Sequence, residues 1–480
     1  MLRTDRSQIV FFVVVALVLR VGLYLAFPGR VHPDETFQYI EQGNRLLGQP
    51  GIVPWEFVMG VRSWVLPAIV AGVLWSARQL SADPLFAIQA VGVAFALLSL
   101  VGVVLGYRVG EAKGGRAAAI ACACLNATTL ELIYLAPHPL PDTIAAPLLF
   151  GGLYVASLGG EAPCRRRFVV AGLLFGCCLA LRVQLAPAIA VGMLMSGGRQ
   201  PRDRLVPLAL GAAVPVALSG ALDWATWGRP FQSIWLYFWV NSVDGAADLF
   251  GTLPWHHYLT FLLNGWAPLL LPVIGVAVLG ARRAPVLGTV ALTIVGTFSL
   301  VGHKEFRFLY PALPLIATLV GLGSADVAGF VFGRLGRRIE ARSLGFMLAL
   351  FWAGLWVLFG AFGPARTYWS HGTAVIESMR IVNRDPVACG IAVEPADRWS
   401  AGGGYSATRP GIRLFGFQPD ADRRQTDAFD YIYSITDKDF APYGFALVRC
   451  WKGQPACLWH RPGGCDPEQG KPVVVTRIPG

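Results

Sequence analysis

Charged residues are scarce in this chain, and long polar stretches are missing before residue 364. Only 14% of the 480 residues are Asp, Glu, Lys or Arg, whereas 55% are hydrophobic, and the mean hydropathy is +0.53. Hydrophobic runs recur from residue 9 to residue 363, and the chain then turns polar. This pattern excludes an ordinary soluble protein and predicts a multi-span membrane domain, 1–363, followed by a small soluble domain, 364–480.

Several motifs of common enzyme classes are also missing. The chain has no Walker A loop, no GxGxxG that opens a βαβ unit, no GxSxG elbow and no HExxH pair. It has no internal repeat, and its two halves lack the matched interrupted helices of inverted-repeat transporters. These absences argue against nucleotide binding, serine hydrolysis and zinc proteolysis, and to a lesser degree against transport. No cofactor is expected.

The net charge of +11 is explained by membrane topology better than by nucleic acid, which is not expected as a partner. Basic residues gather in short loops at 108–116, 165–167, 199–204, 282–283 and 334–342. By the positive-inside rule these loops face the cytoplasm. The segments on the other side are then 28–63, 137–142, 222–258, 303–307 and 364–480.

The hydrophobic segments predict an all-α polytopic domain with about 10–12 transmembrane helices. They lie near 9–27, 64–80, 85–107, 117–136, 143–158, 168–183, 185–196, 205–221, 260–280, 286–302, 308–327 and 344–363. The first one is expected to remain as a span, because it is long, carries Arg20 and has no small-residue cleavage site. If 64–80 and 85–107 both crossed, the basic loop that follows would face the wrong side, so one of them is interfacial, re-entrant or paired differently.

Four of the nine cysteines, Cys389, Cys450, Cys457 and Cys465, lie in the polar C-terminal part. If that part lies outside the cytoplasm, they can form one or two disulfides. A zinc site is the alternative, although no CxxC pair is present.

The stretch His32-Pro-Asp34-Glu35-Thr-Phe-Gln38 follows the first predicted span. Two adjacent carboxylates at a membrane edge suit general-base activation of a hydroxyl nucleophile. Neighbouring residues do not share a helix face, so one carboxylate acts while the other orients. The alternative is a solvated acidic pair at a helix end. Trp55, Glu56 and Arg62 close the same loop, where an aromatic ring beside a carboxylate suits sugar binding or anchoring at the interface.

Two later segments add polar groups on the same predicted side. The loop at 222–258 carries the candidate substrate-binding residues Asn241, Trp255, His256, His257 and Tyr258. The segment at 303–307 carries His303, Lys304 and Arg307, which suit a phosphate, or else hold a helix end by snorkelling.

Three charged residues lie in or beside apolar runs. Arg182 lies inside one, where charge is costly and usually faces a polar cavity, and it is a further candidate for the phosphate. Arg20 could contact the same anion or snorkel. Asp142 is either a second acid or a helix N-cap.

Four blocks together resemble glycosyltransferase family 22. They are His32–Gln38, Trp55-Glu56 with Arg62-Ser63, Phe250-Gly251 with Pro254–Tyr258, and His303-Lys-Glu-Phe-Arg-Phe308. That family contains the alpha-mannosyltransferases of dolichol-linked oligosaccharide and GPI-anchor assembly, within the C superfamily of integral-membrane glycosyltransferases. The block around Asp142 departs from the family, which usually has an Asn-Ser pair before the acid.

The resemblance implies a C-superfamily fold and an inverting transfer of a hexose, most simply mannose, from a polyprenyl-phosphate donor on the non-cytoplasmic face. It implies Asp34 as the base, with Glu35 second, and places Lys304 and Arg307 near the donor phosphate. The acceptor would be a glycan or glycolipid. An Ala-, Gly-, Val- and Arg-rich composition without an ER-retention tail suggests a bacterial inner membrane, with the active site and the C-terminal α/β-like domain on the periplasmic side.

Two other functions stay open at this point: a lipid or polysaccharide flippase without transferase activity, and a same-superfamily transferase that uses another sugar. Asp34, Glu35 and Asp142 could supply oxygen ligands to magnesium or manganese. The resemblance nevertheless implies no metal.

Overall fold

The computed structural model describes residues 4–158, 164–198, 200–419 and 423–474. It forms two compact units. The helical unit contains Met1–Gly22, Phe95–Pro137 and Pro141–Arg366, and the sheet unit contains Leu23–Ala94, His138–Leu140 and Thr367–Gly480. This division does not follow residue 363, because the first outer loop belongs to the same unit as the C-terminal domain.

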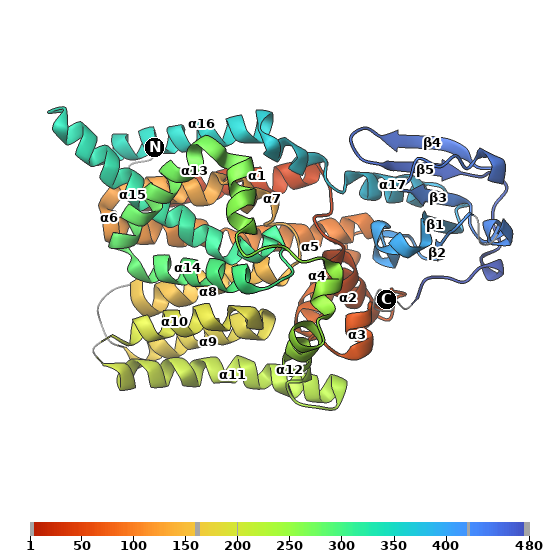
Figure 1. The fold of residues 1–480 in the computed structure, drawn as a ribbon, viewed down its shortest axis with the longest axis horizontal. Coiled ribbons are helices and arrows are strands. Elements are labelled where there is room, and N and C mark those ends of the chain that lie inside the picture. Colours follow the sequence, from red (N-terminus) through yellow and green to blue (C-terminus); the bar gives the residue numbers. More distant parts are fainter. Residues whose placement is uncertain (1–3, 159–163, 199, 420–422, 475–480) are drawn as a thin grey trace. The chain divides into compact units, whose positions relative to one another are not determined.

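The helical unit is a bundle of apolar helices (Figure 1). Its helices are α6 (Val101–Thr128), α7 (Leu130–Tyr134), α8 (Pro141–Leu153), α9 (Arg165–Leu181), α10 (Ala186–Gly197), α11 (Pro201–Trp227), α12 (Gln232–Phe238), α13 (His257–Arg283), α14 (Pro285–Leu300), α15 (Leu313–Arg334) and α16 (Ala341–Phe362). Helices α1 (Asp5–Ala26) and α5 (Pro84–Ser99) each pass from one unit into the other.

Small residues let these helices approach closely. Helix α9 packs along α11, where a Cβ added to Gly172 would lie 2.2 Å from the carbonyl oxygen of Leu208. Helix α13 packs along α15, where a Cβ on Gly323 would lie 1.9 Å from the carbonyl oxygen of Val276. Apolar helices in lipid associate through such close contact, because the hydrophobic effect gives little drive between them there.

Five helical stretches among the described residues are long and apolar enough to cross a membrane: Asp5–Ala26, Pro84–Thr128, Pro201–Trp227, Phe306–Arg334 and Ala341–Phe362. Helix α4 (Val65–Arg78) has 14 residues, fewer than the roughly 20 that a crossing needs, which favours the view that 64–80 does not cross. The total of 10–12 crossings stays a prediction.

The basic loop expected at 108–116 is instead a helical turn. Helix α6 continues through most of it and changes direction at Gly115, whose φ of 73° and ψ of −168° are not helical. A Cβ on Gly110 would lie 2.7 Å from the carbonyl oxygen of Ala118, so the two arms of α6 pack closely. The turn thus needs one glycine for its conformation and another for its packing.

The sheet unit contains α2 (Glu41–Leu46), α3 (Trp55–Met59), α4, α17 (Thr373–Arg384) and a five-stranded sheet in the order β2-β1-β3-β5-β4 (Figure 1). The strands are β1 (Gly390–Glu394), β2 (Arg413–Gly416), β3 (Tyr431–Ser434), β4 (Ala446–Trp451) and β5 (Ala456–His460). Strands β2, β1 and β3 are parallel, whereas β5 is antiparallel to β3 and β4. The mixed sheet with α17 matches the expected α/β-like C-terminal domain.

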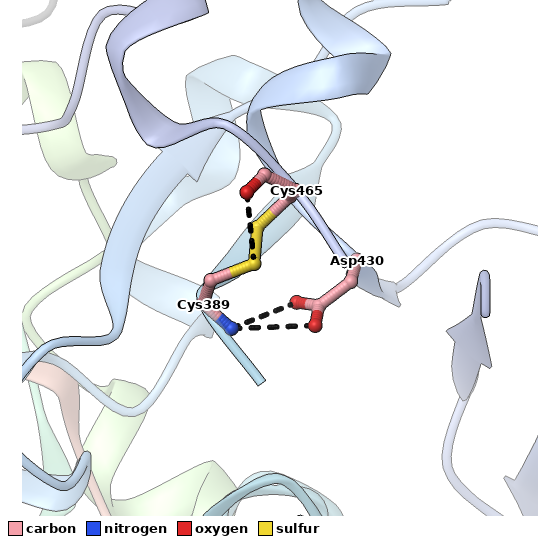
Figure 2. A group of neighbouring side chains, drawn as sticks. All are labelled: Cys389, Asp430 and Cys465. Atoms are coloured by element: carbon pink, nitrogen blue, oxygen red, sulfur yellow. Dashed lines mark hydrogen bonds between the residues drawn. A yellow bond between two sulfur atoms is a disulfide. The ribbon is translucent and has the colours of Figure 1, made fainter. Parts of the chain in front are cut away.

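Both pairs of C-terminal cysteines form disulfides, Cys389–Cys465 and Cys450–Cys457. Figure 2 shows the first, beside Asp430, whose carboxylate accepts hydrogen bonds from the backbone N–H of Cys389 at 3.3 Å. The sulfur atoms are bonded to each other, so they are not arranged as zinc ligands.

Candidate functional site

Glu35 is a buried and fully engaged carboxylate. Its side chain is 5% exposed, at the start of a π-helical turn, Glu35–Ile40. Its Oε1 accepts hydrogen bonds from the backbone N–H groups of Val31 at 2.6 Å and His32 at 3.3 Å. Its Oε2 lies 2.6 Å from Nδ1 of His138. These contacts hold the segment that carries the neighbouring acid.

Asp34 is the more accessible member of the acidic pair, with a side chain 20% exposed. Its backbone N–H donates to Nδ1 of His32 at 3.2 Å, and its Oδ1 lies 3.3 Å from the same nitrogen. The two neighbouring carboxylates therefore differ in environment: Glu35 is anchored, and Asp34 is reachable from solvent. A base must be reachable by the proton that it removes, so Asp34 suits that task better.

His138 is a partner of Glu35 that the sequence motifs do not indicate. It lies in the predicted outer loop 137–142, and its side chain is as buried as that of Glu35. Burial alone would raise the pKa of Glu35, but the charge and hydrogen bond of His138, and then the charge of Arg30, outweigh it and hold the pKa below its usual value. The only hint in the sequence was a histidine in an outward loop.

Gln38, Trp55, Glu56 and Arg62 lie in the same unit. The side-chain amide of Gln38 donates to Oε1 of Glu56 at 2.6 Å, and both side chains are buried, as is Trp55. Burial raises the pKa of Glu56 to about 7, with the positive charge of Arg62 opposing the rise and the negative charge of Asp34 adding to it. The site thus contains a carboxyl group, that of Glu56, whose pKa lies near neutral pH and depends on the charge of Asp34.

The helical unit carries the predicted cationic segment, and Lys304 has no carboxylate partner among the residues that the structure describes. Its Nζ donates to the carbonyl oxygens of Leu253, at 2.9 Å, and of Val301. His303 contacts two acceptors: Nδ1 lies 3.0 Å from the carbonyl oxygen of Gly251 and Nε2 lies 3.2 Å from Oε1 of Glu305.

The hydrogen bond to Glu305 raises the pKa of His303, and burial opposes it. The charged imidazolium is therefore favoured.

Each of the two candidate arginines is paired with a carboxylate. Arg307 binds Glu305 through Nε at 2.6 Å and Nη2 at 2.8 Å. Arg182 lies at the break between α9 and the next turn, rather than inside a helix, and its Nε is 3.0 Å from Oδ1 of Asp142. Both guanidinium groups lie over the ring of Phe308, at 4.9 Å for Arg182 and 5.5 Å for Arg307. The arginines thus form one cluster.

Asp142 lies within the first turn of α8, which begins at Pro141, so it is not the N-cap considered from the sequence. It is fully buried against Arg182. The sequence suggests a second acid here, but it does not indicate the pairing of Asp142 with Arg182.

Only part of the predicted substrate-binding set in the aromatic loop 222–258 contacts the cationic segment 303–307. The hydroxyl of Tyr258 donates to the carbonyl oxygen of Glu305 at 3.1 Å, and Tyr258 is buried. In contrast, Trp255 is 70% exposed and packs edge-on against His256, while His257 contacts the ring of Phe261. Asn241 donates to the carbonyl oxygen of Tyr237, one helical turn earlier. Of these residues, Tyr258 is thus the one held against the 303–307 segment.

The sequence pattern of the Alg9-like mannosyltransferase family matches residues 10–388, which include all of these groups. The chain belongs to this family. The resemblance to family 22 expected from the four blocks is confirmed.

Similar proteins include GPI mannosyltransferase 3 of Yarrowia lipolytica, 27% identical over 310 residues, or 63% of this chain and 60% of that protein. Mannosyltransferase APTG1 of Arabidopsis thaliana is 25% identical over 328 residues, or 65% of this chain and 58% of that protein. The chain spans about three-fifths of the length of these relatives.

Solved structures show the fold. ArnT from Cupriavidus metallidurans, bound to undecaprenyl phosphate, superposes with a TM-score of 0.64 at 12% identity, over 94% of this chain and 97% of that one. The Archaeoglobus fulgidus oligosaccharyltransferase superposes with a TM-score of 0.51 at 12% identity, over 90% of this chain and 69% of that one. The chain therefore has the C-superfamily glycosyltransferase fold, as expected. Its long apolar helices make it a multi-pass membrane protein.

Proposed function

We propose that this Alg9-like family member is an inverting mannosyltransferase. It takes mannose from a polyprenyl-phosphate carrier and transfers it to a hydroxyl of a glycan or glycolipid acceptor on the non-cytoplasmic face. The observation that carries the proposal is the contrast between Asp34, which is partly exposed, and Glu35, which is buried and held by His138 and two backbone N–H groups. Asp34 is therefore assigned as the carboxylate that reacts, and Glu35 as the carboxylate that holds Asp34 in place.

The reaction assigned to these groups is a single displacement. Asp34 accepts the proton of the acceptor hydroxyl, the acceptor oxygen forms a bond to the anomeric carbon, and the bond from that carbon to the phosphate oxygen breaks. The polyprenyl phosphate leaves with the electron pair, and the configuration at the sugar inverts. No nucleotide sugar and no metal are assigned a role.

The positive groups of the helical unit are assigned to the departing phosphate. Lys304 is the first candidate because its charge has no carboxylate partner within the described part of the chain. Arg307 and Arg182, and His303 when it is protonated, would add to the field that stabilises negative charge as it develops. Because Glu305 and Asp142 balance the two arginines, Lys304 gives this group of residues its positive excess.

Two features support the lipid carrier and the side of the membrane. The ArnT structure with a similar fold holds undecaprenyl phosphate, which makes a lipid-phosphate donor a reasonable choice for this chain. The two disulfides of the C-terminal domain suit an oxidising compartment. With the bacterial character of the composition, they favour an inner-membrane protein with this domain on the periplasmic side.

The test is an assay of the purified full chain with radiolabelled polyprenyl-phosphate mannose and a solvent extract of membrane glycolipids as acceptor. The proposal expects labelled glycolipid from this donor and none from GDP-mannose, with the same rate in EDTA. Transfer from GDP-mannose without lipid would contradict the donor. Transfer only from another lipid-linked sugar would contradict mannose, and translocation of labelled lipid across vesicles without a new glycosidic bond would favour a flippase.

A further inference from the structure

Within the sheet unit, residues 29–41 pack against two segments of the C-terminal domain, 371–372 and 400–406; we call these contacts the joint. At one end, backbones meet directly. A Cβ on Gly29 would lie 2.3 Å from the carbonyl oxygen of His371, and one on Gly372 would lie 2.3 Å from that of Arg30. The imidazole Nδ1 of His371 lies 3.0 Å from the same oxygen of Arg30. Side chains larger than hydrogen do not fit there.

In the middle of the joint, the side chain of Arg30 forms hydrogen bonds with the backbone of the C-terminal domain. Its Nη1 donates to the carbonyl oxygen of Gly402 at 2.6 Å, and its Nη2 donates to those of Ser400 at 2.7 Å and Ala401 at 3.1 Å. One guanidinium thus satisfies three consecutive carbonyl groups of the C-terminal domain. Its charge also acts on Glu35, five residues further along the chain.

At the other end of the joint, the carboxylate of Glu41 binds the backbone of the C-terminal domain. It is 0% exposed, and its Oε1 accepts from the backbone N–H of Ser406 at 2.5 Å, while its Oε2 accepts from that of Ile52 at 2.7 Å. The carboxylate lies against Gly404, where a Cβ would be 2.7 Å from Oε1. The φ of Gly404 is +78°, which favours glycine.

The run Gly402-Gly403-Gly404 follows β1, where a glycine-rich loop often binds phosphate. Here the glycines serve packing. A Cβ on Gly402 would lie 2.6 Å from the side chain of Val393, and one on Gly403 would lie 2.5 Å from that of Met379. Together with Gly404 they let the loop pass between the core of the C-terminal domain and Glu41.

We propose that the joint makes the C-terminal domain part of the transferase machinery. The domain holds the acidic segment 32–38 in its working position. Arg30, Glu41 and Gly404 act as positioning residues, because their contacts lie within the joint and they act on the reaction through Glu35 and Asp34. The proposal rests on the proposed function for its effect on catalysis, but not for its effect on the segment's order.

Gly404 and Gly453 provide a matched pair of variants. Their φ angles are +78° and +79°, so alanine is strained to a similar degree at both, but no atom lies within 4 Å of a Cβ at position 453. Gly404→Ala disturbs the joint, and Gly453→Ala disturbs only a turn between β4 and β5. Glu41→Gln is a second joint variant of unchanged size, in which one backbone N–H loses its acceptor.

The experiment measures transfer kinetics and amide hydrogen exchange of the full chain in detergent. The expected result for Gly404→Ala and Glu41→Gln is a kcat at least tenfold lower, with the KM for polyprenyl-phosphate mannose changed less than twofold. Amides of residues 31–41 should exchange at least tenfold faster. Gly453→Ala should resemble wild type in all three measurements.

If the amides of residues 31–41 exchanged equally fast in Gly404→Ala and Gly453→Ala, the proposal that the joint holds this segment would be wrong. Faster exchange with unchanged kcat, or a change confined to KM, would overturn its positioning role. If wild type transfers no mannose while the exchange difference is present, the proposed function fails and the joint stands. If one joint variant does not fold, the other decides, since it changes a different residue of the same contact.

Discussion

The imidazole Nδ1 of His138 lies 2.6 Å from Oε2 of Glu35, although the two residues are 103 positions apart in the chain. Both side chains are 5% exposed, so the pair is shielded from water. Two predicted outer loops, 28–63 and 137–142, therefore meet through one buried contact. Removing one partner of such a pair leaves the other buried and uncompensated.

His138→Ala is expected to lower the free energy of unfolding by about 3 kcal/mol. The pKa of Glu35 is depressed in the folded state, so its stabilising contribution is present above its unfolded pKa and is lost as the pH falls. The deficit of the variant should therefore shrink in acid. Chemical unfolding at several pH values measures this, and Glu35→Gln with His138→Ala should be less than additive. Additive losses would show that the two residues are not coupled.

Glu56 is expected to give transfer a pH dependence near 7, where its pKa lies. Above that pH Glu56 is negatively charged and repels the negative charge of Asp34, which favours transfer of a proton to Asp34, so the rate should rise from pH 6 to pH 8. Glu56→Gln resembles the protonated form and should stay at the low-pH rate throughout. An unchanged profile in this variant would contradict the assignment.

Replacing Glu56 by glutamine is also expected to increase the stability of the protein above neutral pH. Because the folded pKa of Glu56 is raised from 4.5 to about 7, stability is lost as the pH rises through this range, by about 3 kcal/mol in total at 1.36 kcal/mol per pKa unit. Glu56→Gln should therefore unfold at a higher temperature than wild type at pH 8 and show less advantage at pH 5. A variant that is less stable at both pH values would contradict this.

Lys304→Met is expected to lower kcat/KM for the polyprenyl-phosphate donor about tenfold to hundredfold, because a charged hydrogen bond to the departing phosphate contributes about 1.5–3 kcal/mol. Lys304→Arg keeps the charge and should recover part of the loss. Lys452→Met, in the turn between β4 and β5, is the control and should bind donor normally. Equal kcat/KM values for Lys304→Met and its control would contradict the assignment of Lys304 to the donor phosphate.

The disulfides predict the behaviour of the four C-terminal cysteines in intact cells. Alkylation without a reductant should leave Cys389, Cys450, Cys457 and Cys465 unmodified, and mass spectrometry should find peptides linked as Cys389–Cys465 and Cys450–Cys457. Free thiols at all four positions would argue for a cytoplasmic domain.

The sequence was sufficient for the fold class and for the family, because composition, hydrophobic runs and the four blocks are local signals. It could not pair Glu35 with His138, since no periodicity links residues so distant in the chain. It placed Arg182 in an apolar run, but only the fold shows the helix break and the partner Asp142. It also could not show that the predicted outer loop 28–63 contacts the C-terminal domain through Arg30 and Glu41.

The most direct test of the account is a single-turnover measurement with bound polyprenyl-phosphate mannose, comparing wild type with Asp34→Asn. Removing a general base typically costs 10²–10⁴-fold in rate. The account predicts a loss of this size for Asp34→Asn, with donor affinity unchanged because the proposed phosphate ligands are intact. Transfer by Asp34→Asn within tenfold of the wild-type rate would contradict the assignment of Asp34 as the base.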